Sequence, residues 1–333
     1  MKRAGHLFER IVAFDNLLLA ADKTLRGQKH KPAAARFYFH LESELFQLQE
    51  ELTAGSYQPL PYRVFEVREP KPRQICESEI RDRVVHHAIC NLLDPVFERR
   101  MIADSYACRI GKGAHRAVVR AQHFARSHNY FLQCDVRKYF ASIEHAALKS
   151  LLRRILKDPP LLALLDRIID HPLPGSAPGR GLPIGNLTSQ YFANLYLGEL
   201  DHFVKERLGI RGYLRYMDDA LIFGDDKAAL HETLAAVRVY LDDRLKLGLK
   251  EEALRIAPVW TGISFLGFRI FPGTIRLCGD NWSRFRRKVR AHEAAYLAGE
   301  MDEDELARSV ASMIGHTMHA DTLEARRRFF SEG

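Results

Sequence analysis

The sequence has no long apolar run and no recognisable export signal. No uninterrupted apolar stretch approaches the roughly 18 residues that a membrane-spanning helix requires. The chain starts with basic residues, but Leu7-Phe8 is followed at once by Glu9-Arg10, so the apolar region of a signal peptide is missing. These absences predict a protein that stays in the cytoplasm and does not enter a membrane.

Cysteine is scarce, and its spacing argues against the common cysteine-based sites. The chain has five cysteines and no Cys-x-x-Cys pair, so neither a zinc site nor a disulfide framework is expected. Gly111-Lys112-Gly113 and Gly179-Arg180-Gly181 lack the Gly-x-x-x-x-Gly-Lys-Ser/Thr spacing of a phosphate-binding loop. The cysteines, which are expected to be reduced and buried, are Cys76, Cys90, Cys108, Cys134 and Cys278.

Composition and charge are those of a globular protein with a modest basic excess. At 333 residues, with 47% apolar and 28% charged residues, the chain has the size for two domains or for one domain with lobes. The formal net charge of +8 is compatible with nucleic-acid binding but does not establish it. A basic cluster near the C-terminus fits a solvated helix face and a phosphate-following surface equally well. It comprises Arg284, Arg286, Arg287, Lys288 and Arg290.

Apolar spacing changes repeatedly between helical and extended patterns, without the regular order of βαβ units. Apolar residues three and four positions apart predict helices, and short β-branched or aromatic runs predict strands. Asn186 is a good N-cap for one helix, and Gly209 is a good stop for it. An α+β fold fits this mixture better than a doubly wound sheet. The predicted helices span residues 7–55, 81–97, 145–170 with a break at 159–160, 186–209, 227–245 and 282 onward, and the predicted strands span residues 63–67, 132–136 and 263–270.

Two adjacent aspartates, Asp218 and Asp219, lie between short apolar runs at residues 212–215 and 220–223. These runs predict the two strands of a tight hairpin. Neighbouring carboxylates repel each other, so the fold gains nothing from them unless a cation is present. Mg²⁺ supplies such a reason, because it prefers carboxylate oxygens together with substrate phosphate. Aspartate also favours turns without metal, so the pair alone leaves both interpretations open.

A third carboxylate, Asp135, lies at the end of the predicted strand 132–136. Three carboxylates on two adjacent strands have the donors to hold two Mg²⁺ ions about 3.5–4 Å apart. One ion would lower the pKa of an attacking hydroxyl, and the other would stabilise a leaving pyrophosphate. This chemistry is nucleotidyl transfer, in which catalysis consists mainly of positioning and charge neutralisation.

Several further motifs, in order between about residues 71 and 271, make the chain resemble a reverse transcriptase. Each motif is weak alone, but their common order and spacing make chance a poor explanation. The motifs are residues 71–75 with 81–85, which resemble the triphosphate-holding part of the fingers, residues 105–113, Asp135 with Phe140, the box at residues 216–219, and Phe265-Leu266-Gly267, which resembles the primer grip.

The resemblance implies a right-hand polymerase fold within the α+β class. The palm would contain an antiparallel sheet with helices on one face, and the thumb would be helical and basic. The implied domains are residues 1–130 for the fingers and an N-terminal helical region, residues 131–277 for the palm with a fingers insertion around 145–185, and residues 278–333 for the thumb.

The resemblance also implies RNA-templated DNA synthesis with two Mg²⁺ ions, for which Mn²⁺ is a substitute. Asp135, Asp218 and Asp219 would be catalytic and would hold the ions together with the backbone carbonyl of Val136. Phe140 would exclude the 2′-hydroxyl of a ribonucleotide. The remaining implied contacts are Lys71, Arg73, Phe140, Ile184 and Gly185 with the incoming dNTP, Phe265, Leu266 and Gly267 with the primer, and the basic cluster 284–290 of the thumb with nucleic acid.

The segment 181–190 narrows the resemblance to the reverse transcriptases of diversity-generating retroelements. Most reverse transcriptases have Gln where Ile184 stands. The resemblance implies copying of a template-repeat RNA with errors at adenines, and a small basic accessory protein that forms a pentameric ring. Three alternatives stay open: a defence-type or group II intron-like enzyme without hypermutation, an RNA-binding scaffold, and an Ile184 that merely packs the helix entrance.

Other features depart from the family pattern or favour plain structural roles. Where many relatives have lysines, this chain has Glu251-Glu252-Ala253, and whether Lys250 or Arg255 replaces them stays open. Asp225-Asp226 is expected to form a polar turn. Structural roles are also expected for the histidines. For Tyr106 and Arg109, a contact with the template and a role in framework packing are both open. The histidines concerned are His86, His87, His316 and His319, which lack partners at metal-ligand spacing.

Overall fold

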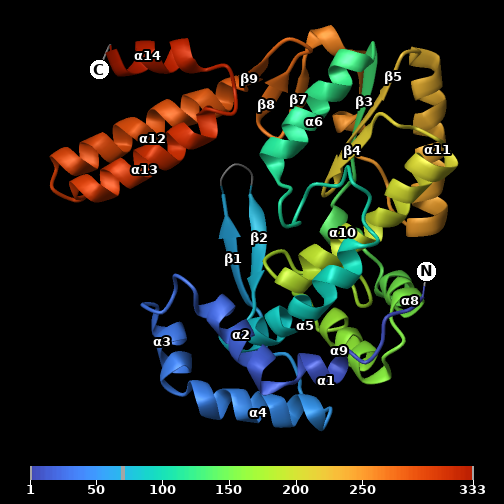
Figure 1. Cartoon of the computed structure of the whole chain (residues 1–333), viewed down its shortest axis with the longest axis vertical. Helices are drawn as coiled ribbons and strands as arrows, with labels where there is room; N and C mark the ends of the chain where they lie inside the picture. The colour runs from blue at the N-terminus through green and yellow to red at the C-terminus, as the bar shows by residue number, and fades with distance from the viewer. Residues whose placement is uncertain (1, 69–71, 332–333) are drawn as a thin grey trace. The chain divides into compact units, whose positions relative to one another are not determined.

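The computed structural model describes residues 2–68 and 72–331 (Figure 1). Helices and antiparallel sheets make up the fold, as the α+β prediction requires. The chain divides into two compact units, each built from three segments. The first unit contains Met1–Ala103, Asp135–Leu208 and Ala236–Lys250, and the second contains Asp104–Cys134, Gly209–Ala235 and Glu251–Gly333.

Helices α5 (Ile80–Glu98) and α10 (Leu187–His202) form the centre of the first unit and pack against each other. Helix α10 is buried on several faces, as expected of a helix inside a core rather than on its surface. The helical predictions for this unit are confirmed, except that the predicted region 7–55 consists of four shorter helices and that Pro159 begins α9 after a short break. The other helices are α1 (Phe8–Ile11), α2 (Phe14–Leu25), α3 (Pro32–Phe39), α4 (Leu41–Thr53), α7 (Tyr139–Ser142), α8 (His145–Ile155), α9 (Pro159–Ile169) and a π-helical segment (Phe203–Arg207).

The start of α10 shows one correction to the sequence prediction. Asn186 occupies the N-cap position, but its side chain makes no capping hydrogen bond. Its Oδ1 instead accepts a 2.7 Å hydrogen bond from the hydroxyl of Ser78, 108 residues earlier in the chain. The predicted helix start is therefore right, and the predicted local cap is wrong because a distant partner takes the same oxygen. The predicted stop holds, since Gly209 adopts a left-handed φ of +68° directly after the π-helical segment.

A two-stranded antiparallel sheet completes the first unit. Strand β1 (Arg63–Val67) pairs with β2 (Arg73–Glu77) from Arg63 opposite Glu77 to Val67 opposite Arg73. Strand β1 is exposed along its length, whereas Cys76 of β2 is buried. The strand predicted at residues 63–67 is thus confirmed. Lys71, expected to contact the triphosphate, lies outside the described residues.

The second unit is built on a four-stranded sheet in the order β4-β5-β3-β6 and a three-stranded sheet in the order β7-β8-β9. Helix α6 (Ala114–Ser127) packs on both sheets, and a shared apolar core fills the space between them. Tyr106 is buried in this core, which supports a framework role. The strands are β3 (Tyr130–Asp135), β4 (Tyr213–Tyr216), β5 (Asp219–Gly224), β6 (Arg255–Pro258), β7 (Ile263–Phe265), β8 (Phe268–Ile270) and β9 (Ile275–Leu277).

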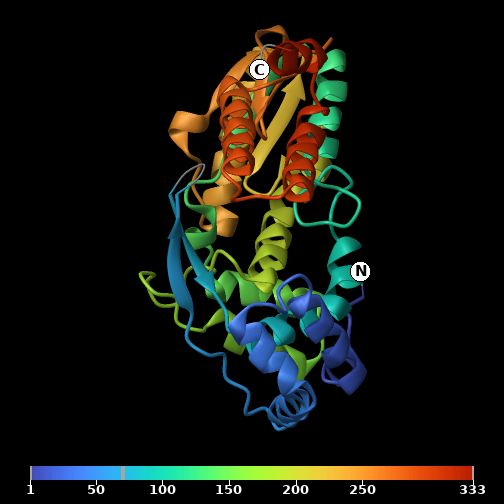
Figure 2. The ribbon, with the colours of Figure 1, turned by 90° about the vertical axis from the view of Figure 1, so that its left-hand side faces the viewer.

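Three helices follow the last strand of the second unit. Helices α12 (Gly279–Leu297) and α13 (Glu303–Thr317) run side by side, as Figures 1 and 2 both show, and α14 (Leu323–Ser331) follows. Phe285 of α12 stacks on Trp282 and meets Phe329 of α14 edge-on, which joins the first and last of these helices. The predicted helical tail is confirmed, and it starts three residues earlier than Trp282. Helix α11 (Lys227–Leu245), also as predicted, contributes residues to both units.

Candidate active site

The predicted acidic hairpin is present. Tyr216 of β4 pairs with Asp219 of β5, and Met217 and Asp218 form the turn between them. All four side chains of this box are partly exposed, whereas the strand residues behind them are buried. Burial and the nearby thiol of Cys108 raise the pKa of Tyr216, so the phenol stays neutral. The hairpin therefore presents two carboxylates at the end of a buried, rigid element.

Two residues that the sequence did not single out hold this hairpin. Arg215 is fully buried, and its Nη1 donates a 2.7 Å hydrogen bond to the carbonyl oxygen of Met217. Gln133 of β3 donates through Nε2 to Asp219 Oδ1 at 3.3 Å and to the carbonyl oxygen of Ser264 at 3.1 Å. The only signal for Arg215 in the sequence is a charged residue inside an apolar strand beside the acidic pair.

Asp135 is the last residue of β3, the strand that lies next to β5 in the sheet. Side chains two residues apart on a strand share a face, so Asp135 lies on the face of β3 that carries Gln133. Val136 lies opposite Leu249 in an antiparallel bridge. Two backbone hydrogen bonds flank this pair: the amide of Lys250 donates to the carbonyl of Asp135, and the amide of Arg137 donates to the carbonyl of Gly248. In this antiparallel pattern the Val136 carbonyl points away from its partner, as a metal-binding carbonyl must.

Several residues of the first unit are predicted to contact the nucleotide, and backbone hydrogen bonds join the segments that carry them. The amide of Cys76 in β2 donates to the carbonyl of Ile184 at 2.9 Å. The amide of Leu182 donates to the carbonyl of Phe140 at 2.8 Å. Ile184 and Phe140 are partly exposed, and Arg73, at the start of β2, is exposed. The structure thus brings Phe140, the Ile184 segment and β2 together.

Gly185 is required by the way this segment meets β2. Its φ is +124°, a conformation that residues with a side chain rarely adopt. A Cβ there would also lie 3.0 Å from the carbonyl oxygen of Cys76 and 3.0 Å from Cγ2 of Ile75. Glycine is therefore the residue that allows the backbone of the segment to approach the strand so closely.

The residues predicted for the primer grip form the turn between β7 and β8. Phe265 is buried, whereas Leu266 and Gly267 form the turn itself with φ of +51° and +85°. The carbonyl of Gly267 accepts hydrogen bonds from the amide of Cys278 at 3.1 Å and from Nδ2 of Asn281 at 3.0 Å. The start of α12 is thereby attached to this turn.

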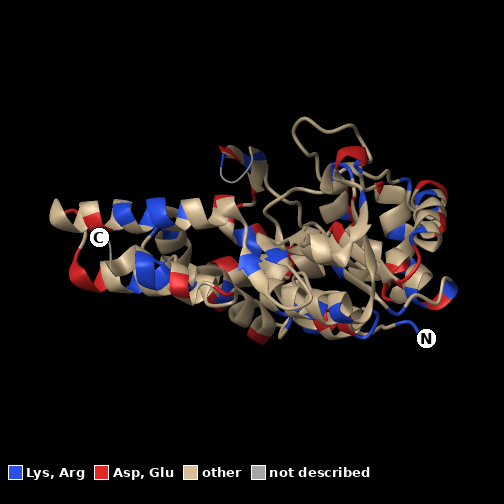
Figure 3. Ribbon diagram, turned by 90° about the horizontal axis from the view of Figure 1, so that it is seen from above, with Lys and Arg blue, Asp and Glu red and all other residues tan. Residues whose placement is uncertain are grey.

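Most of the predicted basic cluster is exposed on α12. Figure 3 marks the lysines and arginines of the described residues in blue. Arg284 is partly buried and donates to Asn281 Oδ1 at 3.3 Å, and Arg290 lies over the ring of Phe329. Between Asp280 and Glu293 the helix has no acidic residue. Five basic side chains and no acidic one thus lie between these two positions. The exposed members are Arg286, Arg287, Lys288 and Arg290.

Several features predicted to be structural are hydrogen-bonded or buried. Asp225 accepts hydrogen bonds from the amide of Asn129, and Asp226 accepts from the amides at the start of α11. His86 is buried. His316 lies beside His115, with 3.4 Å between their ring nitrogens. Arg109 donates to the carbonyl of Ser105 at 2.6 Å, which supports a framework role.

Comparison with known proteins identifies the family. The model of the family described as reverse transcriptase (RNA-dependent DNA polymerase) matches residues 68–270, more than half of the chain. The chain belongs to the reverse transcriptase family. The prediction of an RNA-directed DNA polymerase is thereby confirmed.

Curated relatives of this reverse transcriptase include bacterial and plant proteins. Protein YkfC of Escherichia coli (strain K12) is 28% identical over 273 residues, which cover 69% of this chain and 72% of YkfC. Group II intron-encoded protein LtrA of Lactococcus lactis subsp. cremoris is 24% identical over 170 residues, 49% of this chain and 28% of LtrA. Nuclear intron maturase 1, mitochondrial, of Arabidopsis thaliana is 28% identical over 99 residues, 29% of this chain and 14% of that protein. The matched segment is thus a small part of the intron-encoded relatives.

The donor chemistry of this reverse transcriptase fits Mg²⁺, although the side chains are not gathered into a ready metal site. Within residues 2–68 and 72–331, no group of three His, Cys, Asp or Glu side chains is placed to hold a metal ion. Mg²⁺ is commonly bound by one or two carboxylates together with substrate phosphates, rather than by a complete protein cage. Asp218 and Asp219 on the hairpin and Asp135 at the end of β3 supply hard oxygen donors of this kind.

No helix among the described residues is both long enough and apolar enough to span a membrane.

Proposed function

We propose that this chain is the reverse transcriptase of a diversity-generating retroelement, which copies a template-repeat RNA into cDNA with errors at adenines. The observation that carries the proposal is Ile184. The carbonyl oxygen of Ile184 accepts a hydrogen bond from the amide of Cys76. The next residue, Gly185, has no side chain, and this lets the backbone approach β2 closely. The backbone of Ile184 is therefore fixed, while its side chain is partly exposed.

An apolar side chain on a fixed backbone at this position supports relaxed copying. A glutamine here has donors and an acceptor for the sugar or base of the new pair, whereas isoleucine has neither. Discrimination that depends on hydrogen bonds is much stronger than discrimination by shape alone, since a mismatched substrate leaves buried polar groups unpaired. The partial exposure of Ile184 also favours a contact with substrate over simple packing at the helix entrance.

The proposed chemistry is two-metal nucleotidyl transfer. Asp135, Asp218 and Asp219 would hold two Mg²⁺ ions, with the carbonyl of Val136 as a further donor. The ions, when bound, lower the pKa of the primer hydroxyl and stabilise the leaving pyrophosphate. Gln133 orients the carboxylate of Asp219, and Arg215 fixes the turn that carries Asp218.

The other predicted contacts complete the proposal. Phe140 would exclude a 2′-hydroxyl, and Arg73 with Lys71 would hold the triphosphate. The turn 265–267 would support the primer, and the basic face of α12 would follow the duplex backbone. In this proposal residues 1–130 supply the fingers, 131–277 the palm with a fingers insertion, and 278–333 the thumb. The proposed partners are the template RNA, the primer and growing cDNA, dNTPs, and a small basic accessory protein that assembles as a pentameric ring.

A group II intron-like reverse transcriptase without hypermutation is the second candidate, because LtrA is encoded by such an intron. Sequencing cDNA made by the purified chain on a defined RNA separates the two candidates. The template should carry equal numbers of all four bases in shuffled contexts. Errors concentrated opposite adenines are expected. A low error rate, equal at all four bases, would refute the retroelement assignment and favour the second candidate.

A further inference from the structure

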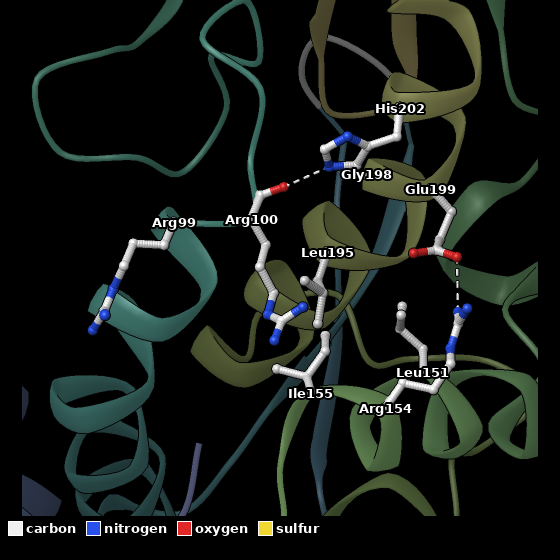
Figure 4. Close-up of a pocket in the computed structure, with 9 residues that line it drawn as sticks. All are labelled: Arg99, Arg100, Leu151, Arg154, Ile155, Leu195, Gly198, Glu199 and His202. Carbon is white, nitrogen blue, oxygen red and sulfur yellow. Dashed lines mark hydrogen bonds and ion pairs between the residues drawn. The ribbon is translucent and has the colours of Figure 1, made fainter. Parts of the chain in front are cut away.

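A cavity of about 270 Å³ in the first unit is rich in arginine (Figure 4). It is formed by residues at the end of α5, on α8 and on the second half of α10. Among its lining residues are Arg99, Arg100 and Arg154, but Glu199 is the single carboxylate. None of the residues predicted to bind metal, nucleotide or primer lines it.

Arg100 is the least satisfied of these arginines. Its Nε is buried and has no hydrogen-bond partner among the described residues. Figure 4 shows its guanidinium beside the apolar side chains of Ile155 and Leu195, while Arg154 is turned toward Glu199. A buried donor without an acceptor costs free energy, and a charged one costs more. The fold carries this cost, and an anion entering the cavity would give the guanidinium group of Arg100 a charged partner.

The carboxylates near the cavity are already occupied. Glu199 accepts a 2.7 Å hydrogen bond from Nη2 of Arg154. Glu206 lies 2.7 Å from Nδ1 of His202, whose Nε2 donates to the carbonyl oxygen of Arg100 at 2.8 Å. Burial lowers the pKa of His202, but the Arg100 carbonyl and the Glu206 carboxylate outweigh it, so the net shift is upward. Within the part of the chain that the structure describes, both carboxylates thus pair with other side chains rather than with Arg100.

A larger cavity of about 640 Å³ adjoins the first and shares Arg154, Glu199 and His202 with it. It adds Arg207 and Arg244, together with the stacked rings of Phe203 and Tyr240, whose centroids are 4.1 Å apart. Both rings are partly exposed. Arginines beside exposed aromatic rings are the combination that binds single-stranded RNA, because the guanidinium takes a phosphate and the ring stacks on a base.

We propose that the two cavities form a second RNA-binding groove, which takes a phosphate at Arg100 and an unpaired base beside Phe203 and Tyr240. The groove lies at the far end of α10 from Ile184. At about 1.5 Å per residue, Glu199 is about 20 Å along the helix from the start of α10. The groove thus holds RNA away from the nucleotide contacts. RNA is favoured over an acidic peptide because Phe203 and Tyr240 offer a stacking surface for a base, and a run of Asp and Glu has no base to place there.

The test measures binding of a fluorescent, single-stranded 12-nucleotide RNA to the full chain by anisotropy at several salt concentrations. The R100Q variant is expected to bind about tenfold more weakly at low salt. Its plot of log affinity against log salt is expected to flatten by about 0.7, the value for one lost phosphate contact on single-stranded nucleic acid. The matched control is R36Q, since Arg36 is exposed on α3 of the same unit and lines neither cavity. Equal binding by R100Q and R36Q would overturn the proposal.

Two further variants separate binding from folding and from catalysis. In E199Q the partner of Arg154 is neutral, so tighter RNA binding is expected, and unchanged or weaker binding would count against the groove. R100Q removes a buried donor that has no partner, so its melting temperature is expected to equal or exceed that of the wild type. D218N, inactive in synthesis under the proposed function, is expected to bind the RNA normally. Binding of an oligoglutamate peptide is measured in the same way. If R100Q weakens peptide binding but leaves RNA binding unchanged, the RNA proposal is wrong and the groove binds a protein partner.

Discussion

The hydrogen bond from Arg215 to the carbonyl oxygen of Met217 holds the acidic turn in an unfavourable backbone conformation. Met217 has a φ of +55°, which costs a residue with a side chain about 1–2 kcal/mol. Arg215 is fully buried, and hydrogen bonds from a charged donor are stronger than neutral ones in such surroundings. The same guanidinium reaches the hydroxyl of Ser105 at 3.4 Å. The turn that carries Asp218 is therefore fixed from the inside of the core.

Replacing Arg215 with methionine is expected to lower both stability and turnover. Loss of the charged donor should reduce the free energy of unfolding by about 2–3 kcal/mol, measured by urea denaturation. Because the turn is released, kcat for dNTP incorporation should fall at least about tenfold while KM for dNTP changes little. The conservative variant R215K should recover part of the stability but little of kcat, since an ammonium lacks the planar fork. Wild-type kcat in R215M would show that the bond does not position the turn.

Asp218→Asn is expected to abolish DNA synthesis. The amide has no negative charge for a divalent cation, so incorporation on an RNA template with a DNA primer should fall by more than about 10³-fold. Asp225→Asn is the matched control, because Asp225 lies after the same strand and accepts a hydrogen bond from Asn129. It should retain wild-type incorporation. An active D218N variant would remove the two-metal proposal.

The sequence predicted those elements that depend on residues close to one another in the chain. Strands β4 and β5 follow from short apolar runs, and the acidic box between them was placed to within a residue. The roles of Arg215 and Gln133 were not predicted, because their partners are set by how distant strands pair. The cap of α10 failed for a related reason: Ser78 takes the oxygen of Asn186 that the helix end needed. Local rules thus located the acidic hairpin, and long-range contacts determined how it is held.

Gly185→Ala is expected to weaken dNTP binding. The substituted residue keeps a φ near +124° only under strain, and its Cβ would press on the Cys76 carbonyl. The Ile184 segment should therefore move away from β2, which raises KM for dNTP several-fold. Gly315→Ala is a suitable control, because a Cβ there meets no atom within 4 Å. Steady-state kinetics with varied dNTP would show the difference, and equal KM values would contradict the proposed role of this segment.

Ile184→Gln is expected to make copying more accurate. The amide supplies hydrogen bonds that depend on correct pairing, so misincorporation opposite template adenines should fall about tenfold, while synthesis on correctly paired substrate continues. Ile184→Leu keeps the apolar character and should retain the error pattern. The measurement is deep sequencing of cDNA from the same defined RNA. An unchanged adenine error rate in I184Q would show that this position does not set fidelity.

His86 gives the first unit a specific sensitivity to acid. The imidazole is 2% exposed, and burial lowers its pKa to about 3, with smaller effects from nearby His87, His171 and Arg83. Its Nδ1 has no hydrogen-bond partner among the described residues. The unfolded chain takes up a proton at this residue near the ordinary value of 6.5, whereas the folded chain resists protonation until about pH 3.

The stability that depends on neutral His86 is therefore complete above pH 6.5 and is lost as the pH falls toward 3. One pKa unit corresponds to about 1.4 kcal/mol, so this single residue should account for up to about 5 kcal/mol over that window. His86→Leu should flatten the plot of unfolding free energy against pH in this range, measured by urea denaturation at closely spaced pH values. The exposed His30, replaced by Gln, is the control and should leave the slope unchanged. Equal slopes in H86L and wild type would mean that the buried imidazole takes up its proton without opening the fold.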